Sequence, residues 1–351
     1  MASTARLCLK ARPTPAQLAD RLRPVDGVWP DGLELYLAAA DLASPESIDI
    51  IAERITAAEV PPDFAWLIEG PVDSLDGDDF DVARDSEADL TVLERLAGLA
   101  RRIHARAVNI HVISPGMNTS RLSLECRAAL LERALPFLAR FVDLVEAAGA
   151  VPTVENMPPV LRMRRSDFAF TPIGMAADDL WWLVERLPGL RVLADTSHAG
   201  LYLNARRLPP DPTYAWSAAL ASYLGQLPDE AASPSHSLHE AASQGHVQGE
   251  GAGQRAADSG GGEAATAPGG AAAALVQYLK NLPNVENAQV SNAQGILGEG
   301  LAYGQGDFDL DPAIAWLGTR ANHIVAETIE ASNDDAILMR HALRRMRMVL
   351  A

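Results

Sequence analysis

The segment 192–202, VLADTSHAGLY, places two chemically capable groups at the end of a short apolar run. The run stops at Asp195, and His198 follows three residues later. A carboxylate and an imidazole this close together can bind a metal ion, contact a polar substrate or transfer a proton. Either residue alone is more often a helix cap, a solvated loop acid or a hydrogen-bonded structural histidine. The pair indicates a functional site only if similar groups recur at the ends of other short apolar runs.

Such groups do recur at the ends of other short apolar runs. They include five carboxylates, two imidazoles and two amides: Glu34, Glu69, Glu155, Asp195, Glu327, His111, His198, Asn156 and Gln289. Carboxylates brought together would repel one another and raise each other's pKa unless a cation lay among them. A divalent ion held by Glu155, Asp195 and Glu327 meets this requirement. Oxygen ligands with at most one nitrogen suit Mg²⁺ or Mn²⁺.

The elements that must position these groups alternate along the chain. Short apolar runs predict eight strands, at residues 6–11, 32–38, 64–70, 108–115, 151–157, 190–195, 285–292 and 323–330. Continuous apolar runs are typical of parallel strands buried on both faces. Helical patterns separate them, as at 44–58 and 90–107. Eight such units predict an α/β fold, a (β/α)8 TIM barrel in one domain spanning 1–351, with a doubly wound open sheet as the alternative.

A TIM barrel brings the carboxyl ends of all its strands to one mouth, where active sites lie. The strand-end groups above would therefore converge. His104, His323 and His341 fall on helices or at the start of a strand, so we expect them to be structural.

Residues 227–270 differ in composition from the rest of the chain. They are rich in Ala, Gly, Ser, Gln and acidic residues and have almost no large apolar ones. A segment of this kind cannot offset its own ordering entropy. It predicts a disordered insertion between the sixth and seventh units. Its histidines (His236, His239 and His246) could bind metal, but the composition favours a polar linker.

Charge and cysteine usage limit the classes of partner. The formal net charge of −17 repels a phosphate backbone, so we expect no nucleic-acid partner. Cys8 and Cys126 cannot form a disulfide framework, which favours a reducing, cytoplasmic setting. The first residues have no apolar targeting segment and no run of 18 apolar residues occurs, so we expect no membrane partner.

Four segments carry a resemblance to a known superfamily: VENM (154–157), LADTSHAGL (193–201), SNAQGILGEGLAYGQGDFDL (291–310) and IVAETIE (324–330). In order and spacing they resemble the sugar-phosphate isomerase/epimerase superfamily. These are the xylose-isomerase-like TIM barrels, which also include the zinc-dependent apurinic endonucleases. The resemblance is clear from about residue 105 to the end, the insertion aside, and looser before it.

The resemblance implies a ligand set and a reaction. One divalent metal would be held by Glu155, Asp195, Gln289 and Glu327. The two glutamates would double as acid and base in a sugar or sugar-phosphate isomerase or epimerase that works by proton transfer through a metal-bound cis-enediolate. His198 and His111 would contact substrate oxygens at the same mouth.

Two positions depart from the superfamily pattern. Gln289 stands where a metal-binding His is usual, and a Gln oxygen suits Mn²⁺ or Mg²⁺ better than Zn²⁺ or Co²⁺. Glu69 stands where the endonucleases keep a zinc-binding His. Together with the net charge, this disfavours an endonuclease.

Further substrate contacts are predicted at Glu69, Asn156 and Arg162. Arg162 lies in an arginine-rich loop that could clamp a phosphate or carboxylate, although pairing with nearby acids is the alternative. A dehydratase or lyase of the same superfamily remains open, as does a metabolite-binding barrel without metal or catalysis. Superfamily members are often dimers or tetramers, so a homo-oligomer is also open.

Overall fold

The computed structural model describes residues 5–24, 29–228 and 268–351. The predicted insertion at 227–270, with its three histidines, lies almost entirely outside the described residues. The described chain leaves off after the sixth barrel strand and its helices, and resumes before the seventh strand. This is the place in the barrel that the composition predicts.

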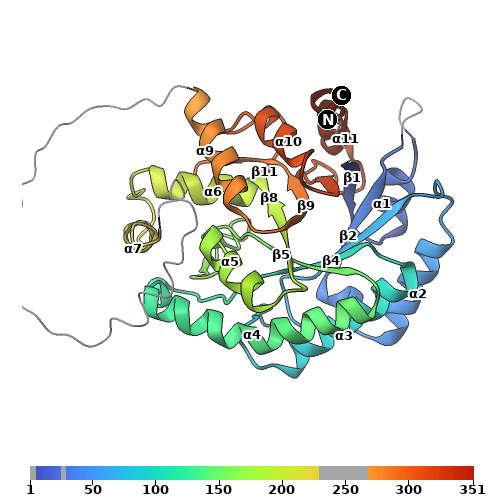
Figure 1. Cartoon of the computed structure of the whole chain (residues 1–351), viewed down its shortest axis with the longest axis horizontal. Coiled ribbons are helices and arrows are strands. Elements are labelled where there is room, and N and C mark those ends of the chain that lie inside the picture. Colours follow the sequence, from blue (N-terminus) through green and yellow to red (C-terminus); the bar gives the residue numbers. More distant parts are fainter. Residues whose placement is uncertain (1–4, 25–28, 229–267) are drawn as a thin grey trace, which may run out of the picture.

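Eight parallel strands close into a barrel, surrounded by helices (Figure 1). The order around the barrel is β1-β12-β9-β8-β5-β4-β3-β2, with β1 pairing both β12 and β2. The strands are β1 Arg6–Ala11, β2 Gly32–Tyr36, β3 Ala65–Glu69, β4 Ala107–His111, β5 Val151–Glu155, β8 Arg191–Asp195, β9 Val285–Val290 and β12 His323–Ala326. The predicted TIM barrel is therefore confirmed, and the open sheet is wrong because no sheet edge remains between β1 and β12.

Helices cover the outside of the barrel (Figure 1). They are α1 Pro15–Arg21, α2 Pro45–Thr56, α3 Glu87–Ile103, α4 Leu124–Ala147, α5 Ala177–Arg186, α6 Thr196–Arg207, α7 Ser217–Leu224, α9 Pro268–Asn281, α10 Asp311–Leu317 and α11 Ile337–Leu350, with short 3₁₀ turns at Ala39–Leu42 and Thr119–Arg121. Ser44, Ser86 and Ser123 each cap a helix by accepting a hydrogen bond from a backbone N–H of the first turn. Within the described chain, none of these helices is both long and apolar enough to cross a membrane.

A small apolar layer lies inside the barrel and explains why the polar groups share one mouth. It consists of Cys8, Leu67, Ala107 and Val325, which form a cluster separate from the main core. Side chains of a strand alternate between its two faces, so residues two positions further on point into the same interior. Those residues are Lys10, Glu69, Asn109 and Glu327. The apolar layer is thus followed, toward the carboxyl ends, by a charged one.

Two hairpins extend beyond the barrel strands at this end of the molecule. They are β6 Val160–Leu161 with β7 Ala169–Phe170, and β10 Asn292–Gln294 with β11 Gly298–Leu301. Helix α6 packs against β10 and β11. Cys8 is buried and Cys126 half-buried, and both are free thiols.

Candidate active site at the barrel mouth

The strand ends bring nine polar side chains together, which we call the polar ring. Its members are Lys10, Glu34, Glu69, Asn109, His111, Glu155, Asp195, Gln289 and Glu327. Register places several of them side by side. Lys10 is the Cα partner of Glu34, His111 the partner of Glu155, and Asp195 the partner of Gln289. The structure therefore gathers in the ring the five predicted carboxylates, His111 and Gln289, and adds Asn109, which the sequence did not predict.

Lys10 is a member of the ring that the sequence reasoning missed. Its Nζ lies 2.5 Å from Glu69 Oε2 and also forms an ion pair and hydrogen bond with Glu327 Oε1. Although burial opposes the charged form, Glu327 and Glu69 raise the pKa of Lys10 well above its usual value. The ring thus contains its own permanent cation. A signal was present: the chain has only two lysines, and one of them lies in a buried strand.

Glu155 lies between an amide and two imidazoles. Its Oε2 accepts a hydrogen bond of 2.8 Å from Asn109 Nδ2, and its Oε1 lies 2.8 Å from His198 Nδ1. His111 Nε2 is 3.7 Å from Glu155 and 3.3 Å from Glu69. Burial opposes protonation of both rings, yet the carboxylates raise the pKa of His111 and raise that of His198 well above its ordinary value.

His198 is held on both sides. While Nδ1 faces Glu155, Nε2 lies 3.0 Å from Glu299 Oε1 on β11. Despite burial, the hydrogen bond from His198 lowers the pKa of Glu299 to about 2. Arg164 Nη2, from the loop between β6 and β7, contacts the other Glu299 oxygen at 3.3 Å. Glu299 was not among the predicted site residues, because it belongs to a hairpin rather than to a barrel strand.

Asp195 has a structural task as well as a place in the ring. Its Oδ1 accepts a 2.6 Å hydrogen bond from the backbone N–H of His198 and so caps helix α6. The Asn156 side chain accepts from the Asp195 N–H at 2.7 Å and donates to its carbonyl at 3.0 Å. Asn156 therefore positions Asp195 in this structure. Burial raises the pKa of Asp195 to about 6.

Gln289 faces the carboxylates with its amide group. Its Nε2 donates to Glu34 Oε2 at 2.6 Å and to Glu69 Oε2 at 2.8 Å. Its Oε1 is buried and has no hydrogen-bond partner among the described residues. Burial and the neighbouring Glu69 raise the pKa of Glu34 to about 8. Burial would also raise the pKa of Glu69, but Lys10 and His111 outweigh it and lower that pKa to about 2.

In the described chain, Arg162 forms its ion pairs with loop acids and not with members of the ring. It has a left-handed backbone, with φ of 58°, and its Nε donates to Asp79 Oδ1 at 3.0 Å. A second contact, of 3.2 Å, joins Nη1 to Asp167. In this structure its guanidinium is paired with acids of the surrounding loops, so a substrate phosphate would have to compete with them.

The donors at the mouth fit a hard divalent cation. Besides Gln289 Oε1, the Glu327 Oε2 atom is buried without a hydrogen-bond partner in the described chain, and every candidate ligand there except the imidazoles is an oxygen. Two groups of ligand atoms, each within 4.8 Å of one another, contain most of the predicted set. They are Glu155 with Asp195 and His198, and Glu327 with Glu34 and Glu69, so three of the four predicted ligands are divided between two groups.

The raised pKa of Glu34 gives a prediction for the metal-free protein. Folded Glu34 keeps its proton up to about pH 8, while the unfolded chain releases it near 4.5, so the free energy of unfolding should fall as the pH rises between these values. Glu34→Gln should reduce this fall, measured by urea unfolding in EDTA at about pH 5 and about pH 8. Glu94→Gln on α3, at an exposed pair with Arg140 and not with Glu34, is the control and should leave this fall unchanged. An equal fall in wild type and Glu34→Gln would contradict the assignment.

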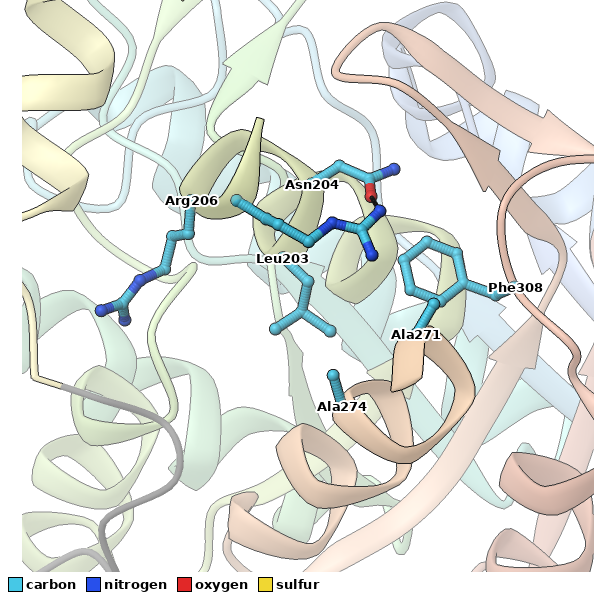
Figure 2. Close-up of a pocket in the computed structure, with 7 residues that line it drawn as sticks. Leu203, Asn204, Arg206, Ala271, Ala274 and Phe308 are labelled. Atoms are coloured by element: carbon cyan, nitrogen blue, oxygen red, sulfur yellow. Dashed lines mark hydrogen bonds between the residues drawn. The ribbon is translucent and has the colours of Figure 1, made fainter. Parts of the chain in front are cut away.

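A cavity of about 210 Å³ lies elsewhere, in the helix layer (Figure 2). Within the described chain its lining comes from α6, α9 and the segment before α10: Leu203, Asn204, Arg206, Arg207, Ala271, Ala274 and Phe308. Within this lining, Arg207 Nη2 donates to Asn204 Oδ1 at 2.9 Å. The lining includes no member of the polar ring, so we place the candidate site at the strand ends and not here.

Comparison with known proteins identifies the fold. No protein-family model and no curated protein matches the chain. Solved structures match it along nearly its full length. A D-tagatose 3-epimerase-like protein has a TM-score of 0.57 at 13% identity, covering 98% of both chains. A 3-keto-D-glucoside 4-epimerase from E. coli has 0.55 at 13%, covering 98% of this chain and 99% of that one. Endonuclease IV from Thermus thermophilus has 0.53 at 14%, covering 98% of both chains. The chain therefore has the xylose-isomerase-like barrel fold, which these sugar epimerases and endonuclease IV share.

Proposed function

We propose that this chain is a divalent-metal-dependent isomerase or epimerase of small sugars, sugar phosphates or related polyol carbonyl compounds. The observation that carries the proposal is the polar ring itself. Two glutamates, Glu155 and Glu327, lie at strand ends separated in the barrel by β8 and β9, among more carboxylates than the nearby cations can neutralise. The barrels with similar structures include proteins described as epimerases, which agrees with this choice.

The metal would be Mn²⁺ or Mg²⁺, held by Glu155, Asp195, Gln289 and Glu327. The unpaired oxygens of Gln289 and Glu327 support this, since hard cations prefer such donors. When bound, it would polarise a substrate carbonyl and so lower the pKa of the adjacent C–H.

The protein's own groups divide the proton transfer between them. Glu155 receives hydrogen bonds from Asn109 and His198, an arrangement that suits a carboxylate acting as base. Burial raises the pKa of Glu327 well above its usual value, which suits an acid that returns a proton. Removal of the proton from the carbon beside the carbonyl leaves an enediolate. Return of a proton to the opposite face of that carbon gives an epimer, and return of a proton to the former carbonyl carbon gives an isomer.

The imidazoles would stabilise the oxygens of the enediolate. His198 and His111 are both buried and both have raised pKa values for the reasons given above, so each can donate a hydrogen bond to a developing negative charge. Arg162 would bind a substrate phosphate or carboxylate only after leaving Asp79. We therefore propose a smaller role for Arg162 than for the two imidazoles.

Solvent deuterium exchange tests the proposal. The protein is incubated in D₂O with Mn²⁺ and a panel of ketoses, aldoses and their phosphates, and the products are followed by NMR and mass spectrometry. We expect deuterium at the carbon next to the carbonyl, with no loss of water. Loss of water with exchange would indicate a dehydratase. Ligand binding without exchange, and without metal under any condition, would indicate a binding barrel and overturn the proposal.

A further inference from the structure

The Lys10 ammonium occupies a distinct part of the mouth, where Glu34, Glu69 and Glu327 converge. Its Nζ contacts Glu69 at 2.5 Å and is ion-paired with Glu327. Glu34 is its Cα partner on β2. The ammonium also lies 5.4 Å from the centroid of the Tyr36 ring. The side chain is 13% exposed, so the charge is held inside the protein rather than in solvent.

The same place has the donors of a divalent-cation site. Ligand oxygens of Glu34, Glu69 and Glu327 lie within 4.8 Å of one another. A second observation is independent of these acids. Gln289 Oε1 belongs to an amide that lies against Glu34 and Glu69, its residue is fully buried, and the described chain offers it no hydrogen-bond partner. An amide oxygen left unpaired on a side chain that contacts two of these carboxylates is a group that a cation would satisfy.

We propose that Lys10 takes the place of a second divalent ion, and that its removal turns the Glu34–Glu69–Glu327 group into a site for Mn²⁺ or Mg²⁺. The ammonium already contacts Glu69 Oε2 and Glu327 Oε1, so a second divalent ion cannot bind these two oxygens while Lys10 is in place. An ion bound at about 2.0–2.5 Å from them would lie within a few ångströms of Nζ and be repelled by it. Because the lysine is part of the chain, it competes at a fixed and high local concentration. Wild type therefore holds no ion at this group.

This inference depends on the proposed function only for the number of ions in wild type. If the ion at Glu155, Asp195, Gln289 and Glu327 binds as proposed, wild type contains one ion and the lysine variant two. If it does not, wild type contains none and the variant one. The difference in bound ions between wild type and the lysine variant tests the role of Lys10. The number of ions bound by wild type tests the proposed function.

The experiment compares wild type, Lys10→Met, Lys280→Met and the double variant Lys10→Met/Glu34→Gln. Each is stripped with chelator, dialysed against Mn²⁺ and analysed by metal mass spectrometry, with EPR to detect coupling between neighbouring Mn²⁺ ions. Lys280 is the other lysine of the chain and is exposed on α9, so its variant controls for loss of a lysine. Lys10→Met should gain one Mn²⁺ per chain, and Lys280→Met should gain none. The double variant should lose the gain, because a ligand is missing.

An unchanged ion count in folded Lys10→Met would overturn the proposal, as would a gain that persists in the double variant. Lys10→Met leaves three carboxylates, two of them buried, without their cation, so it could fail to fold in the absence of metal. Lys10→Gln, which keeps a hydrogen-bond donor toward the carboxylates, is therefore measured alongside and should gain the same single ion. Thermal unfolding provides a further readout: Mn²⁺ should raise the melting temperature of either Lys10 variant by more than that of wild type.

Discussion

Replacing Glu155 by Gln is expected to lower the rate of solvent deuterium exchange by about 10²- to 10⁴-fold, the usual contribution of a general base. The variant should also lose bound Mn²⁺, because a neutral amide replaces a carboxylate ligand. The fold should persist, since Gln has nearly the same shape and its oxygen can still accept the hydrogen bond from Asn109. Exchange, metal content and circular dichroism measured on one preparation separate these effects.

Glu94→Gln provides the matched control for this prediction. Glu94 lies on α3, its side chain is 57% exposed and it pairs loosely with Arg140. The same chemical change there should alter neither exchange nor metal content. If Glu155→Gln kept the wild-type exchange rate and the wild-type metal content, Glu155 would be neither the base nor a metal ligand.

The largest effect on stability is expected at the buried ion pair between α4 and α5. Arg127 Nε donates to Asp179 Oδ1 at 2.7 Å, and Asp179 Oδ2 accepts from the Gly174 N–H at 2.9 Å. Arg127 is 3% exposed and Asp179 fully buried. Arg127→Met should leave Asp179 without its cation and lower the free energy of unfolding by about 3–5 kcal/mol. Urea unfolding at neutral pH measures it.

A double variant tests whether the uncompensated charge is the cause. Arg127→Met/Asp179→Asn removes both charges, and the Asn oxygen can still accept from Gly174, so it should recover part of the loss. Arg140→Met, at the exposed pair with Glu94, should change stability little, because exposed pairs contribute little. If the double variant were less stable than Arg127→Met, the explanation would be wrong.

The barrel could be predicted from the sequence because its strands are continuous apolar runs. All eight expected strands are present, and each begins within one residue of the predicted start. Helix α6 was not predicted. Nearly all of its residues are buried, so it lacks the alternation of polar and apolar faces that marks most surface helices. The β6–β7 and β10–β11 hairpins are too short to give a periodic pattern.

The site could be predicted in part. Carboxylates at strand ends were recognised, since a parallel barrel must bring them together. Their pairing was not, because it depends on side-chain directions that spacing does not give. Gln289 is the example: its position was predicted, but the sequence could not show that its amide nitrogen faces Glu34 and Glu69 while its oxygen has no partner in the described chain. Lys10 was missed because its pairing with Glu69 and Glu327 also depends on side-chain direction. Glu299 was missed because it lies on a hairpin too short to predict.

Asp195 both caps helix α6 and belongs to the polar ring, which has a consequence for mutational libraries at this position. A helix needs a short acceptor at its cap, and Asp, Asn and Ser supply one equally well. A screen for folded protein should therefore return these three residues at position 195. A screen for turnover should return Asp alone if the carboxylate binds metal. The difference between the two sets of survivors would separate the structural need for an oxygen from the chemical need for a charge, at a single codon.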